Sequence, residues 1–223
     1  MLEKAKHLAS PISGFIRQMR FPYRYFMDKH KCIFIHVPRT AGTSVLRSLG
    51  APDGGRLHLP WHVYRSANPK KYERYFKFSF VRNPWDRAWS AYKYLKAGGN
   101  QTSDLTVCQM ILEYDNFDDF VRRGLGNGEF RSHLLFLPQS FFLVGPHGEV
   151  KVDLVCRTEK FHQDIKLICE TLELRPPSVL GEINVSPEHE YPILSETGKE
   201  ILDEIYRQDI FSFGYSFPYS LLE

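Results

Sequence analysis

The sequence predicts an α/β fold, a single domain whose central and mainly parallel sheet is covered by helices on both faces. Short apolar runs rich in β-branched residues alternate with segments in which apolar residues recur at helical spacing. Two of these runs end in a loop that leads directly into a helix, as crossover connections between parallel strands do. The 223 residues suit one domain. We expect a basic N-terminal segment, residues 1–30, to lie on a domain of residues 31–223.

The first strand–loop–helix unit carries a predicted anion site. Cys32–Val37 favours a buried strand, Pro38 ends it, and small residues precede a helix predicted over Thr43–Leu49. The first amides of a helix have no intrahelical partner, so a phosphate fits beside this turn. Nucleotide triphosphatases carry a lysine directly after the second glycine of their loop, whereas here the cation stands earlier, as Arg39. The domain is therefore P-loop-like rather than a standard P-loop.

The second unit repeats this arrangement. Phe76–Arg82 alternates as a strand does, Asn83 suits a helix N-cap, and Pro84 suits the first helical position. Ser90 lies two turns into the predicted helix, away from its apolar stripe. Two units that each end in a cation near hydroxyl side chains indicate a ligand with two separated anionic groups.

The remaining elements follow from periodicity and turn signals. Gly145-Pro-His-Gly148 is typical of a turn, so we expect a hairpin between two flanking strands. The predicted strands are Phe141–Val144 and Val152–Cys156, the predicted helices Phe161–Leu172 and Glu196–Arg207, and the predicted flexible, acceptor-side loops Lys96–Thr106 and Gly124–Glu129.

Both units resemble the donor-binding motifs of sulfotransferases. Val37–Ser44 is similar to the 5′-phosphosulfate loop of that family, and Phe80–Tyr92 resembles its 3′-phosphate motif, with arginine and serine at the family's spacing. Weaker matches to the carbohydrate (Golgi-type) branch occur in the same order as in the family. They are Leu137–Ser140, Val152–Glu159, Asn184–Ser186 and Asp209–Tyr215. The resemblance spans about residues 31 to 215.

The resemblance implies the donor 3′-phosphoadenosine 5′-phosphosulfate, the product adenosine 3′,5′-bisphosphate, and transfer of a sulfuryl group without a metal to an acceptor hydroxyl, such as that of a glycan or a small hydroxyl compound. The implied donor-binding residues are Arg39, Thr40, Ala41, Gly42, Thr43 and Ser44 for the 5′ end, Arg82 and Ser90 for the 3′ phosphate, and Arg157 toward the adenine. The family usually has lysine at position 39. Since arginine is a poor proton donor, we interpret Arg39 as an electrostatic stabiliser of the leaving phosphate.

Transfer to an alcohol also requires a base, and neutral imidazole suits that role near pH 7. Of nine histidines, His58 and His62 follow the first helix, where glycan sulfotransferases commonly place theirs. We favour His58, with His62 assisting it or acting instead. His36 is interpreted as a core residue. The other candidates are His133, Glu73 and Glu129.

Composition sets further limits. A net charge of +3 is mild, so it does not imply binding to nucleic acid. The four cysteines form no C-x-x-C pair, so we expect reduced core thiols and no metal site. No apolar run is long enough to span a membrane. We therefore expect a soluble, cytoplasmic protein of bacterial or phage type, or one of the Golgi lumen if the chain is a trimmed piece.

Two other functions stay open at this point. The substitution at position 39 is compatible with a nucleotide-binding module that has lost turnover. Val152-Asp153 is compatible with the metal-binding carboxylate strand of a P-loop kinase-like phosphotransferase.

Overall fold

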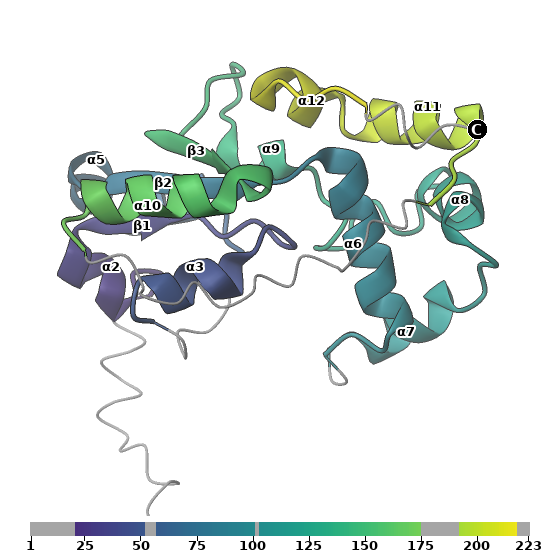
Figure 1. Cartoon of the computed structure of the whole chain (residues 1–223), viewed down its shortest axis with the longest axis horizontal. Coiled ribbons are helices and arrows are strands. Elements are labelled where there is room, and N and C mark those ends of the chain that lie inside the picture. The colour runs from purple at the N-terminus through teal and green to yellow at the C-terminus, as the bar shows by residue number, and fades with distance from the viewer. Residues whose placement is uncertain (1–20, 52–56, 101–102, 175–191, 218–223) are drawn as a thin grey trace, which may run out of the picture.

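The computed structural model describes residues 21–51, 57–100, 103–174 and 192–217. Its centre is a three-stranded parallel sheet in the order β1-β2-β3, formed by Cys32–Phe34, Phe76–Val81 and Leu154–Arg157 (Figure 1). The predicted α/β class with a parallel sheet is confirmed.

The register of the sheet brings the ends of its strands to one edge. Cys32 pairs with Phe76, Phe78 pairs with Leu154, and Val81 pairs with Arg157. The first strand is shorter than predicted, although the amide of Ile35 still donates to the carbonyl of Phe78 at 3.0 Å. The predicted anion loop and the start of the second unit's helix therefore follow neighbouring strands at the same edge.

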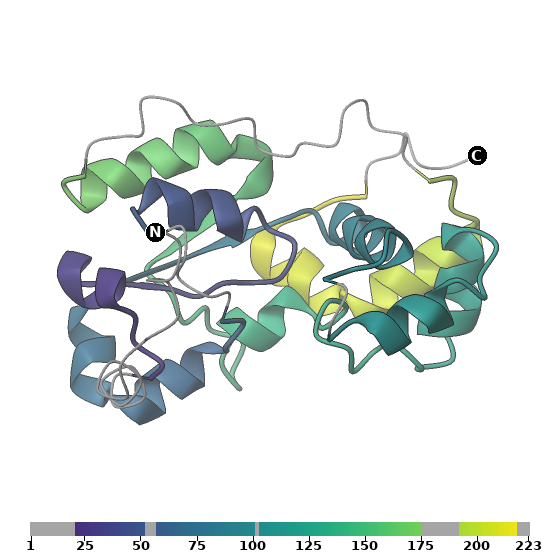
Figure 2. The same ribbon diagram turned by 90° about the horizontal axis from the view of Figure 1, so that it is seen from below.

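Helices cover both faces of the sheet. Figure 2 shows α3 and α10 on one face and α4 and α5 on the other. The helices of this part of the chain are α2 (Tyr25–His30), α3 (Gly42–Ser48), α4 (Trp61–Ala67), α5 (Pro69–Arg74), α9 (Gln139–Leu143) and α10 (Phe161–Thr171), with a 3₁₀ turn, η2 (Thr158–Lys160), before α10. The predicted helices of the first unit and of residues 161–172 are thus present within one residue of their expected ends.

A second group of helices lies beyond the end of the sheet where β2 runs into α6 (Figures 1 and 2). Its members are α6 (Pro84–Lys96), α7 (Leu105–Ile111), α8 (Phe117–Asp119), the π-helix η1 (Phe120–Leu125), α11 (Glu196–Ile205) and α12 (Arg207–Phe213). They enclose their own hydrophobic cluster, which includes Trp85, Phe120 and Tyr206, separate from the cluster around the sheet. The two clusters meet at α12, since Phe213 is buried in the cluster around the sheet while Ile210 packs against the other cluster.

The start of the described chain packs on the sheet. Tyr23, Phe26 and Met27 are buried in the cluster around the sheet, and the hydroxyl of Tyr23 donates to the carbonyl of Tyr64 at 2.9 Å. Residues 1–20 lie outside the described part of the chain, so the expected boundary at residue 30 stays a prediction.

The predicted strand Val152–Cys156 is present as β3, Leu154–Arg157, but the described residues show one antiparallel bridge, Val144 to Val150, in place of the expected hairpin. Three further elements differ in kind or extent. Phe141–Val144, expected as a strand, lies in and just after α9, because the buried carboxylate of Asp209 accepts hydrogen bonds from the two amides that begin this helix. Gly124–Glu129, expected as a flexible loop, begins inside η1, where Gly124 and Leu125 are buried. The last helix is two helices, α11 and α12, that meet at Tyr206.

Candidate functional site

The loop between β1 and α3 has the backbone shape of an anion cradle. Arg39 and Ala41 adopt left-handed conformations, with φ of 67° and 59°, on either side of Thr40. Thr40 is fully buried, and its hydroxyl donates to the carbonyl of Val37 at 2.9 Å. Alternation of this kind turns successive amides toward one side, which forms a concave site for an anion. Left-handed non-glycine residues cost about 1–3 kcal/mol each and cluster at ligand sites.

The first residue of α3, Gly42, must be a glycine because another side chain lies very close to its backbone. A β-carbon added to it would lie 1.7 Å from Nε2 of His36 and 2.2 Å from its Cδ2. The glycine therefore has no room for any side chain. Sequence reasoning assigned Gly42 to ligand access, and the structure adds this packing reason.

Arg39 connects the two predicted donor motifs. Its Nε and one terminal nitrogen donate to the hydroxyl of Ser90 at 3.2 and 3.0 Å, and its Cζ lies 4.7 Å from the centre of the Tyr94 ring. Ser90 is buried, in the middle of α6. The arginine of the first motif thus contacts the serine of the second, although sequence reasoning grouped Ser90 with Arg82. Tyr94 is not among the site residues predicted from the sequence. Its spacing of four residues from Ser90, which puts both on one helix face, is the signal that could have found it.

Arg82 stands at the junction of β2 and α6, and its backbone is clamped. Its amide donates to Oε1 of Gln139 at 2.9 Å, and its carbonyl accepts from Nε2 of the same side chain at 2.8 Å. Gln139 is fully buried. The Arg82 guanidinium is half-buried and forms no hydrogen bond or ion pair with the described residues. It is available for an anion beside the N-terminus of α6, where Asn83 caps the helix as predicted.

Arg157 is engaged by the end of the chain. Its guanidinium donates to the carbonyls of Phe213 and Gly214, the latter at 3.3 Å, and lies 4.5 Å from the centre of the Tyr215 ring. These contacts hold the segment after α12 against β3. The expected contact of Arg157 with adenine stays a prediction.

The two favoured histidines have different surroundings. His58 is half-buried, and its Nδ1 lies 2.9 Å from the carbonyl oxygen of His36. Because a carbonyl only accepts hydrogen bonds, Nδ1 carries the proton, and in the neutral ring Nε2 carries the lone pair that a base needs. His62 is exposed on α4, with its ring against the edge of Trp61. The structure therefore brings His58 into contact with His36, the residue just before the first motif, whereas the ring of His62 contacts that of Trp61.

The other candidates for the base are buried, bonded to another side chain, or exposed on the surface. Burial lowers the pKa of His133 below its usual value. Glu129 accepts a hydrogen bond from the Tyr114 hydroxyl at 2.7 Å, and Glu73 is exposed on α5. Asp153, the metal-ligand candidate of the kinase alternative, accepts from the backbone and ammonium of Lys77, just before β3 begins. It lies at the amino edge of the sheet, and the anion loop lies at the carboxyl edge.

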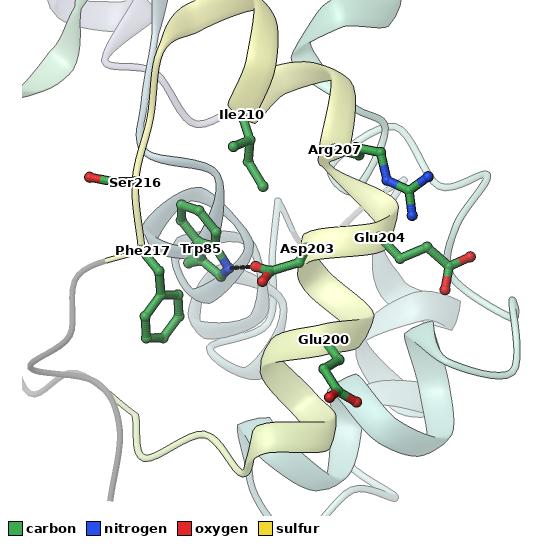
Figure 3. A pocket seen from close by; sticks show the side chains of 8 residues that line it. All are labelled: Trp85, Glu200, Asp203, Glu204, Arg207, Ile210, Ser216 and Phe217. Atoms are coloured by element: carbon green, nitrogen blue, oxygen red, sulfur yellow. Dashed lines mark hydrogen bonds between the residues drawn. The ribbon is translucent and has the colours of Figure 1, made fainter.

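A surface pocket at the start of α6 is lined by other residues. Figure 3 shows Asp203 accepting a hydrogen bond from the Trp85 indole, at 2.8 Å, on one wall of it. The pocket is lined by Trp85, Glu200, Asp203, Glu204, Arg207, Ile210, Ser216 and Phe217. Its three carboxylates and one arginine make it unsuited to a polyanionic donor.

Within the described ranges, no group of three or more metal-ligating side chains occurs, and no helix there is long and apolar enough to cross a membrane. The four cysteines are buried with free thiols, and burial raises the pKa of Cys32 and of Cys156 to about 12. Asn184–Ser186, one of the motif matches, lies outside the described residues.

Comparison with known proteins gives one family. No curated protein sequence and no solved structure matched the chain significantly. The sequence model of the sulfotransferase family matches residues 24–216, which include β1, the anion loop, α6 and the segment held by Arg157. Since this match covers most of the 223 residues, the chain belongs to the sulfotransferase family.

Proposed function

We propose that this sulfotransferase takes its sulfuryl group from 3′-phosphoadenosine 5′-phosphosulfate and transfers it to a hydroxyl of a carbohydrate or of a small hydroxyl compound. The contact between Arg39 and Ser90 carries the proposal, because through it the two segments that resemble donor motifs meet. A donor with phosphate groups at two separate positions suits cations that follow two neighbouring strands. The carbohydrate branch is supported by the motif resemblance alone.

In the proposed reaction, each side chain has one task. Arg39 and the loop amides stabilise negative charge on the departing phosphate, without giving up a proton. Arg82 and Ser90 hold the 3′ phosphate. The acceptor oxygen forms a bond to sulfur as the bond from sulfur to the donor phosphate oxygen breaks, and Nε2 of His58 takes the hydroxyl proton. The products are a sulfate ester and adenosine 3′,5′-bisphosphate. We place this reaction in the cytoplasm, which the four free thiols support.

Nucleotide binding tests the donor assignment. Titration calorimetry in the presence of a chelator should show binding of adenosine 3′,5′-bisphosphate, and adenosine 5′-monophosphate is the matched control that lacks the 3′ phosphate. Arg82→Gln should weaken binding of the bisphosphate while leaving that of the monophosphate unchanged. Binding of ATP only with magnesium would instead indicate the phosphotransferase alternative.

Turnover tests the base. His58→Ala should lower sulfate transfer by about 10²-fold or more and spare affinity for the bisphosphate. His62→Ala, at the exposed histidine of α4, is the comparison variant, and we expect it to retain transfer. A screen of labelled sulfate transfer to sugars, phenols and lipids identifies the acceptor. A wild-type protein that binds the bisphosphate but transfers nothing would be the binding-module alternative.

A further inference from the structure

His36 contacts both Gly42, at the end of the anion loop, and the proposed base His58. From the sequence alone it is interpreted only as a core residue. Its side chain is 5% exposed and lies in a row of rings across the sheet. The imidazole stacks on Phe34 at 5.3 Å between ring centres, and Phe34 stacks on Phe78 at 5.2 Å. This stacking between β1 and β2 fixes the orientation of the imidazole independently of any ligand.

One edge of the ring lies against the first residue of α3. Nε2, Cδ2 and Cε1 of His36 all lie within 2.5 Å of the place that a β-carbon on Gly42 would occupy. The ring therefore packs directly against Gly42, the first residue of α3, which follows the left-handed Ala41. The position of the ring is thus linked by direct packing to the residue at which the anion loop enters α3.

The backbone of the same residue holds the proposed base. The carbonyl of His36 accepts the hydrogen bond from Nδ1 of His58, and the two imidazole rings lie 4.3 Å apart at an angle of 48°. When Nε2 of His58 takes a proton, the ring becomes an imidazolium, and its bond to this carbonyl becomes charge-assisted and stronger. His36 thus supports the charged form of the base.

We propose that His36 is a positioning residue that fixes the base His58 relative to the donor loop, through its carbonyl on one side and its ring on the other. This inference rests on the proposed function. The acceptor oxygen must meet sulfur in line with the departing phosphate, and a misplacement of about 1 Å costs about 10²-fold in rate. Because His36 contacts both His58 and Gly42, it sets the distance between the proposed base and the donor loop.

The test is a double-mutant cycle between His36 and Gly42, with three readouts. Gly42→Ala should weaken binding of adenosine 3′,5′-bisphosphate by about tenfold or more and lower the melting temperature, because its methyl group collides with the ring. In His36→Ala/Gly42→Ala the methyl group has room, so affinity and melting temperature should return to those of His36→Ala. Turnover per nucleotide-binding site should stay about 10²-fold below wild type in both variants that lack the ring. His36→Val, which fills more of the space but lacks the distal ring edge, replaces His36→Ala if the alanine variant does not fold.

The outcomes separate this inference from the proposed function. If the wild-type protein binds no bisphosphate and transfers no sulfate, both are wrong. If the wild-type protein is active but Gly42→Ala is equally harmful with and without the ring, or if His36→Ala keeps wild-type turnover per site, only the role of His36 is wrong.

Discussion

Asp209 should be among the most sensitive positions of the protein, although no step of the proposed reaction uses it. It is fully buried, and its two carboxylate oxygens accept hydrogen bonds from the amides of Gln139 and Ser140, both at 2.7 Å. In Asp209→Asn one oxygen becomes an NH₂ group that faces an amide donor. Hydrogen bonds to a charged group contribute about 1.5–3 kcal/mol, and a stranded buried donor adds to the loss, so we expect the free energy of unfolding to fall by about 2–4 kcal/mol.

The effect should reach the donor site. Gln139 clamps the backbone of Arg82, so loosening α9 should weaken binding of adenosine 3′,5′-bisphosphate by about tenfold, which corresponds to ~1.4 kcal/mol. Urea unfolding measures the first effect and calorimetry the second. Glu204→Gln is the control, since it removes a carboxylate that is exposed on α11. A loss below about 1 kcal/mol in Asp209→Asn would refute this account of how α9 is held.

Three further predictions each concern a single residue. Tyr94→Leu should lower turnover by about 2–5-fold, the value of one cation–π contact, and this loss should be smaller in an Arg39→Lys background, where the flat guanidinium is absent. Ala41→Gly should raise the free energy of unfolding in urea by about 0.5–1 kcal/mol, because relief of a left-handed alanine at ~1–2 kcal/mol outweighs the ~0.5–1 kcal/mol of extra chain entropy. Burial lowers the pKa of His133 in the folded state, so the unfolded state binds more protons below pH 6.5. Stability should therefore fall on acidification from pH 7 to 5, and melting curves of His133→Gln should show a smaller fall.

The two strand–loop–helix units could be predicted from sequence because their signals are local. Pro38 ends an apolar run, and Asn83 with Pro84 begins α6, whatever the rest of the chain does. The family's motifs lie on these same segments. The placement of Arg39 and Arg82 at one edge of the sheet then follows from parallel pairing, which the alternation of elements predicts.

Elements that depend on distant partners could not be predicted in this way. Phe141 and its neighbours have strand-like composition, yet they form α9 because Asp209, 70 positions from Gln139, satisfies the helix's first amides. The role of Gly42 depends on the ring of His36, which the chain brings back through a turn. Short apolar segments carry too little periodicity to decide between helix and strand, so the tertiary contact decides.

Three of the four weak motifs, those that lie in the described part of the chain, contact the junction of β2 and α6 or the helix α9 beside it. The hydroxyl of Thr158 donates to the carbonyl of Val81 at 3.0 Å, and Glu159 accepts from the amide of Asn83 at 2.5 Å and from the hydroxyl of Tyr215 at 3.2 Å. Leu137–Ser140 and Asp209–Tyr215 meet through the buried Asp209 carboxylate. The Asp209 contacts are buried, so substitution of Asp209 leaves two buried amides unsatisfied, whereas the hydrogen bonds of Glu159 are exposed and contribute less. These contacts converge on Val81, Arg82 and Asn83, so we interpret the motifs as supports of the junction between β2 and the helix that carries Ser90.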